Sequence, residues 1–157
     1  MKKELLKGFM MVLLVVVLAL ASAAVAAAQS ASKVVADVPF EFNIGYKTMP
    51  AGEYLVQILT TAGDSLMIQN ADRSNSAVRL SEVTDRVKIK PQARLIFHRY
   101  GQQYFLAEVW NGQDNIGRRL LKSQEERKLQ VDLAGIPAAD PTAKNPYETV
   151  EVLASLR

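Results

Sequence analysis

The sequence predicts an all-β domain, a small antiparallel sandwich or barrel of about seven to nine strands, with one short helix near the C-terminal end. From Val34 onward, short segments rich in β-branched and aromatic residues are separated by turn-forming residues, a spacing that is typical of sandwiches and barrels. One segment, 124–134, carries the signals of a helix instead. The 157 residues include no cysteine, so the core must form without disulfides.

A segment with the composition of a secretory signal peptide precedes the domain. Lysines near the start are followed by an uninterrupted apolar run and then by alanine-rich residues, which is the order of regions in such a peptide. The A-x-A spacing predicts cleavage after Ala28, with Ala23 and Ala26 as other suitable sites. Residues 1–28 would then be removed, leaving 29–157 as a single domain that is periplasmic or secreted. The alternative is an uncleaved membrane anchor, because the segment is long enough to span a bilayer.

The positive charge of the chain comes largely from this segment. The whole chain has 19 basic and 16 acidic residues, and residues 1–28 hold three lysines and one glutamate. Cleavage therefore leaves 16 basic and 15 acidic residues, a net charge of +1. The sequence pI of about 9.2 gives no reason to expect a nucleic-acid-binding surface. Membrane contact is expected only through the N-terminal segment, if it stays uncleaved.

Composition excludes several kinds of catalytic and metal site. Without cysteine there is no thiol nucleophile, no thiolate zinc site and no lipid-modified N-terminal cysteine. His98 is the only histidine, which excludes a histidine-rich metal site. The acidic residues form no pattern of the calcium-loop type. We therefore expect no metal and no cofactor.

The first expected strands lie between residues 34 and 60. In VVADVPFEFNI, residues 34–44, Pro39 predicts an edge strand or a strand that begins at the proline, because proline cannot donate to a ladder. Residues 45–52 have glycine at both ends and predict a loop. Residues 53–60, EYLVQILT, predict the next strand.

A short meander follows. SLMIQ, residues 65–69, and AVRLSEV, residues 77–83, predict two strands on either side of a polar turn. In TDRVKIKPQ, which follows, Val87 and Ile89 alternate with basic residues. This alternation predicts one apolar face and one solvated face.

Residues 95–110 predict a hairpin that contains most of the chemically versatile side chains. Gly101 and Gln102 form a two-residue loop of the type II′ kind. The resulting register pairs Tyr100 with Gln103, Arg99 with Tyr104, His98 with Phe105, Phe97 with Leu106, Ile96 with Ala107 and Leu95 with Glu108. Both faces are largely apolar, so we expect a central hairpin that is covered on both sides.

This register places His98 and Trp110 on opposite faces of the hairpin. His98 is expected to be a hydrogen-bonded core or boundary residue, because a general base needs a nearby nucleophile and an orienting acid. Glu108 could orient it only if the register slipped by one residue. Trp110 is expected to cover the core rather than to form a ligand platform. Arg99 and Tyr104 are expected to form a cross-strand cation–π pair.

Residues 124–134 predict the single helix. SQEE, residues 123–126, is a capping box, in which the Ser123 hydroxyl accepts from the Glu126 amide while the Glu126 carboxylate reaches back to the cap. Gly135 follows the expected last turn and is placed to end the helix.

The segments that flank this helix carry two further signals. Before it, Arg118, Arg119 and Lys122 lie close to the helix N-terminus, where free amides attract anions. They could bind a carboxylate or phosphate, but we favour a solvated basic turn that balances the glutamates of the first turn. After the helix, residues 135–147 hold three prolines and predict an extended connection, and residues 149–156 predict a last strand.

Several of these stretches resemble a group of small exported bacterial proteins of unknown function. VPFEFNIG with MPAGEY, FHRYGQQYFLAEVW and GRRLLKSQEERKL match recurring patterns of that group, V-P-F-x-F-x-x-G, P-A-G-x-Y, F-H-R-Y-G-x-x-Y-F-L-x-x-V-W and G-R-x-L-x-K-S-x-x-E-R. The resemblance covers residues 36–130, and the group often has proline where this chain has Leu121. It implies export and a shared fold, and it implies no catalytic residue.

We expect a non-enzymatic binding or structural module of the cell envelope or exterior, whose partner is a small ligand or an envelope component. The residues expected around a concave binding surface are Arg99, Tyr100, Tyr104, Trp110 and Arg118. A small hydrolase or isomerase that uses His98 is the alternative, and it requires a cleft with a hydroxyl or carboxylate within reach of the imidazole. A third hypothesis is an assembly module that pairs through an exposed strand, most readily the strand of Pro39.

Overall fold

The computed structural model describes residues 33–59, 64–85, 90–113, 115–134 and 146–157. The expected signal peptide, the strand around Val87 and Ile89, and most of the proline-rich connection lie outside the described residues. No helix in these described ranges is long and apolar enough to cross a membrane.

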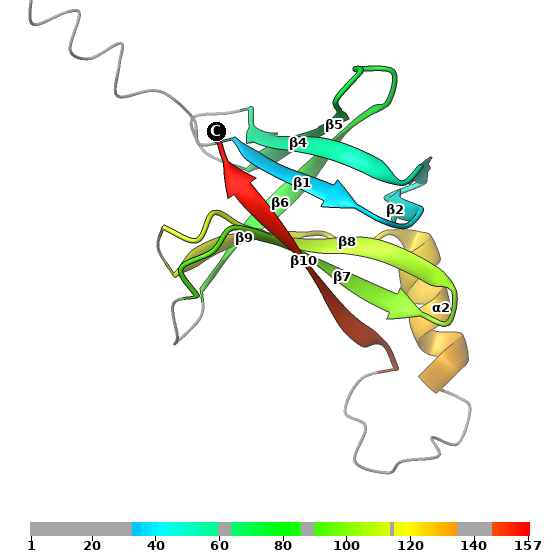
Figure 1. Ribbon diagram of the computed structural model, residues 1–157. Coiled ribbons are helices and arrows are strands. Elements are labelled where there is room, and N and C mark those ends of the chain that lie inside the picture. Colours follow the sequence, from blue (N-terminus) through cyan, green and yellow to red (C-terminus); the bar gives the residue numbers. More distant parts are fainter. Residues whose placement is uncertain (1–32, 60–63, 86–89, 114, 135–145) are drawn as a thin grey trace, which may run out of the picture. The chain divides into compact units, whose positions relative to one another are not determined.

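Strands dominate the described chain, with one helix before the last strand (Figure 1). In chain order the elements are β1 (Val34–Val38), β2 (Phe42–Ile44), β3 (Lys47–Met49), β4 (Gly52–Ile58), β5 (Ser65–Asn70), β6 (Ser76–Asp85), β7 (Arg94–Tyr100), β8 (Gln103–Trp110), β9 (Ile116–Leu120), α2 (Gln124–Ala134) and β10 (Glu148–Leu156).

Eight of the strands close into an antiparallel barrel. The sheet runs β8, β7, β10, β1, β4, β5, β6 and β9, and β9 then pairs again with β8 to complete the ring. Strands β2 and β3 form a hairpin outside the ring, and β2 joins β8 in parallel at Asn43 and Phe105. The predicted fold class, a small antiparallel sandwich or barrel with one short helix, is therefore confirmed, and the structure is a barrel with eight strands in the ring and two outside it.

The region around Pro39 differs from its prediction. Pro39 lies in the break between β1 and β2, where its missing N–H interrupts no ladder. Strand β1 is flanked by β4 and β10, and β2 by β3 and β8, so the expectation of an edge strand here is wrong. The expected loop 45–52 contains β3, which follows a tight turn at Gly45, whose φ is +66°.

Alternation along the strands fills the barrel with apolar side chains. The buried core consists of Val34, Ala36, Val38, Phe42, Ile44, Met49, Tyr54, Val56, Leu66, Ile68, Ala93, Leu95, Phe97, Leu106, Val109 and Leu120. The single phenol among them, Tyr54, donates a hydrogen bond of 2.6 Å to the carbonyl of Pro50. The predicted strands 53–60, 65–69 and 77–83 are confirmed as β4, β5 and β6.

The hairpin β7–β8 follows the predicted register through its first four pairs. Tyr100 lies opposite Gln103, and the register continues to Phe97 opposite Leu106. Gly101 has a φ of +61° and Gln102 has no positive φ, which fits the predicted type II′ turn. The register then shifts, so that Ile96 pairs with Glu108.

This shift makes Ala107 the extra residue of a β-bulge, and the bulge reverses the facing of the strand end. Val109 turns into the core opposite Leu95. Trp110 is buried outside that core, over the outer face of Gly117. The prediction that His98 and Trp110 lie on opposite faces is therefore wrong, because it assumed an unbroken ladder.

Helix α2 has the predicted bounds, 124–134, and half of the predicted capping box. The Ser123 hydroxyl accepts a hydrogen bond of 3.1 Å from the amide of Glu126. The Glu126 carboxylate turns to the sheet instead of the cap and contacts His98 and Tyr100. Its position fixes α2 against the outer face of the hairpin (Figure 1).

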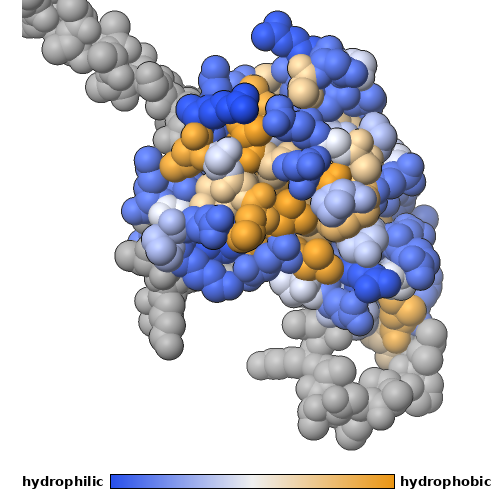
Figure 2. Space-filling model, in the orientation of Figure 1, coloured by the Kyte–Doolittle hydropathy of each residue, from blue (hydrophilic) through white to orange (hydrophobic). Residues whose placement is uncertain are grey.

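The predicted last strand is confirmed as β10, which completes the ring by pairing with both β1 and β7. It meets β1 only at its C-terminal end, from Ala154 to Leu156, and the two strands diverge beyond that point. Phe40, Val150 and Val152 are partly buried and pack against the core. Figure 2, in the orientation of Figure 1, shows apolar surface in the middle of the face that β10 crosses.

Candidate functional site

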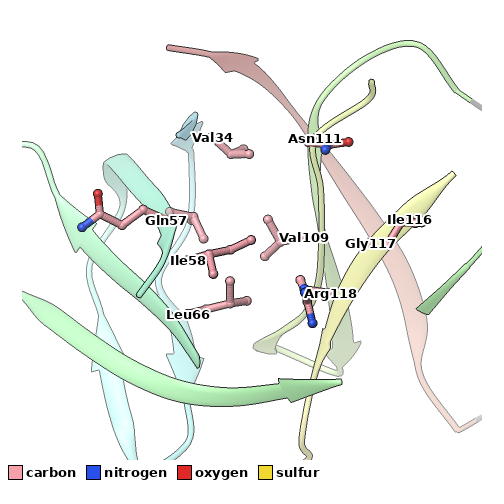
Figure 3. A pocket seen from close by; sticks show the side chains of 10 residues that line it. Val34, Gln57, Ile58, Leu66, Val109, Asn111, Ile116, Gly117 and Arg118 are labelled. Atoms are coloured by element: carbon pink, nitrogen blue, oxygen red, sulfur yellow. The ribbon is translucent and has the colours of Figure 1, made fainter. Parts of the chain in front are cut away.

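A cavity lies inside one end of the barrel. Strands β1, β5 and β9 begin at this end, and β4 and β8 finish there. The cavity has a volume of about 230 Å³. It is lined by Val34, Val56, Gln57, Ile58, Leu66, Val109, Asn111, Ile116, Gly117 and Arg118 (Figure 3).

The inner wall of this cavity is apolar because inward-facing positions of the neighbouring strands β1, β4 and β5 meet an inward-facing position of β8 across the barrel. Val34, Val56, Leu66 and Val109 all belong to the buried core. Figure 3 shows Ile58, Leu66 and Val109 pointing toward one another into the space, whereas Gln57 points away from it. A wall of this kind favours apolar parts of a ligand.

Exposed apolar side chains continue this wall toward solvent. Ile58 is 37% exposed and Ile116 is 47% exposed, although both line the cavity. Val83, on the strand next to Ile116, is 62% exposed and lies opposite Arg118. Exposed apolar groups gathered around an opening are typical of ligand-binding grooves.

Arg118 supplies the positive charge at this site. It is half-buried on β9, opposite Val109 on β8. Within the described residues its guanidinium has no ion pair and no hydrogen bond. The next residue, Arg119, points to the opposite face of β9 and pairs with Glu108 at 3.2 Å. A guanidinium next to apolar walls is a suitable partner for a carboxylate or phosphate.

A second cluster of polar side chains is buried under α2. Glu126 Oε1 lies 2.8 Å from His98 Nδ1 and accepts a hydrogen bond of 3.3 Å from the Tyr100 hydroxyl. The ring of Tyr147 stacks on His98 with 3.9 Å between ring centroids. Lys122 Nζ lies 4.9 Å from the centroid of the Tyr147 ring.

Burial and negative charge make the tyrosines of this cluster hard to ionise. Desolvation raises the pKa of Tyr100 well above its usual value, and the nearby Glu126 carboxylate adds to the effect. The pKa of Tyr147 is raised by the same two causes in the same order, with a further contribution from Glu108. Both phenols therefore stay protonated and act as hydrogen-bond donors or packing groups at neutral pH.

His98 is hydrogen bonded and largely buried, as the sequence predicts. Its side chain is 14% exposed, and Glu126 is its one hydrogen-bond partner among the described residues. His98 is absent from the walls of the barrel cavity. The imidazole thus joins α2 and Tyr147 to the sheet.

Trp110 lies in a separate group on the outer face of the barrel. It is 2% exposed, and its indole N–H donates a 2.9 Å hydrogen bond to Glu108 Oε2. Arg94 covers the indole at 5.4 Å. Arg119 donates from Nε to Glu108 Oε1 at 3.2 Å and from Nη2 to Thr84 at 2.9 Å. These contacts hold the ring in place and leave it no open face as a ligand platform.

The five residues expected around one concave surface are not brought together. Arg99 lies 5.6 Å over the ring of Tyr104, which confirms the predicted cation–π pair, and Tyr104 in turn stacks on Phe40 at 4.0 Å. Tyr100 lies under α2, Trp110 lies over β9, and Arg118 lines the cavity. Only Arg118 therefore lies where a small ligand could enter.

The basic residues before α2 also separate. Arg118 and Arg119 occupy opposite faces of β9, and Lys122 donates to Gln130 at 2.8 Å. We considered two hypotheses for these residues, an anion site and a solvated turn that balances the glutamates of the helix. The structure fits neither of them, because Arg119 pairs with Glu108 of β8. The three residues share no single anion site.

Sequence reasoning missed the apolar wall of the cavity. The signal that could have found it is the alternation of inward-facing residues on β4 and β5, together with Arg118 at an inward-facing position of β9. The closure of the ring between β8 and β9 was needed to bring these faces together.

The chain has no match among protein-family models, curated proteins or solved structures.

Proposed function

We propose that this protein is an exported, non-enzymatic binding module, periplasmic or secreted, that holds a small and largely apolar ligand inside one end of its barrel. The observation that carries the proposal is the cavity of about 230 Å³, whose apolar wall continues into the exposed side chains of Ile58 and Ile116. Eight-stranded barrels have an interior that side chains can just fill or that can hold one small ligand. Export is supported by the signal-peptide pattern of residues 1–28.

A hydrolase or isomerase that uses His98 has less support. The carboxylate that such a mechanism needs is present at 2.8 Å. That carboxylate, however, belongs to the first turn of α2 and is buried together with Tyr100. The His98 side chain is 14% exposed and is covered by the ring of Tyr147, so it offers a substrate little room, whereas the barrel cavity is open at one end.

The proposal is tested with a neutral apolar fluorophore, N-phenyl-1-naphthylamine, titrated into the purified protein. We expect saturable binding at one site. Ile116→Trp places a larger side chain in the cavity opening, and displacing about two methylene-sized groups of ligand should weaken binding about tenfold. Leu153→Trp is the matched control, because Leu153 is 60% exposed on β10 and does not line the cavity. Equal affinities of the two variants, or no saturable binding, would contradict the proposal.

A further inference from the structure

The residues that line the barrel cavity carry charge of one sign. Of its ten lining residues, Arg118 is the only ionisable one, and none is acidic. Gln57 and Asn111 supply neutral polar groups. Elsewhere on the described chain, Arg99 and Arg119 each have a carboxylate within 3.3 Å. The cavity therefore offers a positive charge with no negative partner of its own among the described residues.

A half-buried guanidinium in this position favours an anionic ligand group. Removing a charge from water without a counter-charge costs free energy, and a bound carboxylate or phosphate would supply both the counter-charge and paired hydrogen-bond acceptors. Two exposed neighbours of Arg118 are apolar, with Val83 opposite it on β6 and Ile116 two residues before it. Asp85, opposite Ile116, lies farther along β6 and does not line the cavity. The anionic group would thus carry an apolar part that packs on these side chains.

The cavity volume limits the length of that apolar part. A water molecule occupies about 30 Å³ of liquid, and a methylene group is of similar size. A cavity of about 230 Å³ therefore accommodates a chain of roughly eight methylene groups. Longer chains would extend past Ile58 and Ile116 into solvent.

We propose that the ligand is an anionic amphiphile with a single apolar chain, whose anionic group pairs with Arg118 while the first part of its chain fills the barrel cavity. This inference rests on the proposed function, because it names the ligand class of the same site. The anionic group is the carboxylate of a free fatty acid or the phosphate of a lipid headgroup, which share the chemistry that Arg118 recognises.

A chain-length series tests the apolar part. Carboxylates from butanoate to dodecanoate are titrated into the purified protein by calorimetry, below their micellar concentrations. Affinity should rise about fourfold with each added methylene while the chain still enters the cavity. The gain per methylene should then fall beyond about eight carbons. An affinity that does not depend on chain length would overturn the inference.

A headgroup comparison tests the role of Arg118. Octanoate should bind more tightly than 1-octanol, and Arg118→Gln should weaken octanoate binding between about tenfold and a hundredfold while changing octanol binding less than about twofold. Arg118→Lys keeps the charge and should recover part of the loss. Arg127→Gln is the matched control, since Arg127 is exposed on α2 outside the cavity. Octyl phosphate and a short-chain lysophospholipid distinguish the two sources, and tighter binding of either anion than of octanol supports the inference.

The outcomes separate this inference from the proposed function. Equal binding of octanol and octanoate, with both blocked by Ile116→Trp, overturns the anionic class and leaves the apolar binding site in place. Binding of both that Ile116→Trp leaves unchanged overturns the site itself. Fluorescence of Trp110 would reveal whether Arg118→Gln unfolds. If it does, the anionic class is tested by comparing octanol with octanoate in the unmodified protein.

Discussion

At Gly117 the backbone of β9 comes so close to the indole of Trp110 that a side chain has no room. A Cβ placed on Gly117 would lie 2.6 Å from Trp110 Cδ2, which is far inside van der Waals contact. The residue is opposite Trp110 in the β8–β9 pairing that closes the barrel. Glycine at this position therefore allows the indole to pack on the sheet and reach Glu108.

Gly117→Ala should displace the indole and destabilise the protein by about 1 to 3 kcal/mol, the usual cost of overpacking. Urea unfolding measures the loss, and Trp110, the single tryptophan of the chain, reports its own exposure by fluorescence. In a Trp110→Phe background the smaller ring should reduce the cost of the alanine. An equal cost in both backgrounds would show that the strain arises elsewhere.

Among the elements, the β7–β8 hairpin shows where sequence reasoning succeeds and where it stops. Gly101 fixes the turn and therefore the first four pairs, all of which were predicted. The bulge at Ala107 could not be predicted, because Leu106 and Ala107 are both small enough and apolar enough for either face. A β-bulge increases the local twist of a strand, and a sheet needs such twist to close into a ring. The reason for the extra residue therefore becomes clear only in the closed barrel.

Deleting Ala107 should remove the bulge and leave a folded protein. The shortened strand would still place Leu106 opposite Phe97 and Glu108 opposite Ile96, so each remaining side chain keeps its face. Deleting Val109 is the comparison, because it would bring Trp110 opposite Leu95 and into the core. Circular dichroism and Trp110 fluorescence should show native-like signals for the first deletion and loss of the fold for the second. The reverse order would contradict the assigned bulge.

Helix α2 and the cavity show the same limit at a larger separation along the chain. The bounds of the helix follow from local signals between Ser123 and Gly135, which the sequence displays. The Glu126 carboxylate could bond either to the N-terminal cap of its helix or to His98. It bonds to His98, which lies on β7 and is 28 residues away in the sequence, so local sequence signals could not predict this contact. Arg118 was identified as a site residue, but its companions were chosen from nearby sequence rather than from the strands that surround it.

At the scale of the whole described chain, the barrel is held together by pairings between distant segments. Strand β1 pairs with β10, β2 pairs with β8, and β6 pairs with β9. Three tyrosines with raised pKa values are spread over this structure: Tyr54 in the core near Asp72, and Tyr100 and Tyr147 under α2. Because a small barrel is expected to unfold in one cooperative step, their ionisation affects the stability of the entire molecule.

Stability should fall as the pH rises above about 10, the value at which an unfolded tyrosine ionises. The folded state keeps these three phenols protonated to higher pH than the unfolded chain, so the stabilisation is complete below pH 10 and is lost as the pH rises toward the folded pKa values. Each tyrosine contributes at most about 1.4 kcal/mol per pH unit. Urea unfolding between pH 8 and 11 measures the slope. Tyr100→Phe should make this slope shallower, and Tyr46→Phe, which removes a phenol from a side chain that is 65% exposed, is the matched control. Identical slopes for the two variants would show that burial of Tyr100 does not govern its proton.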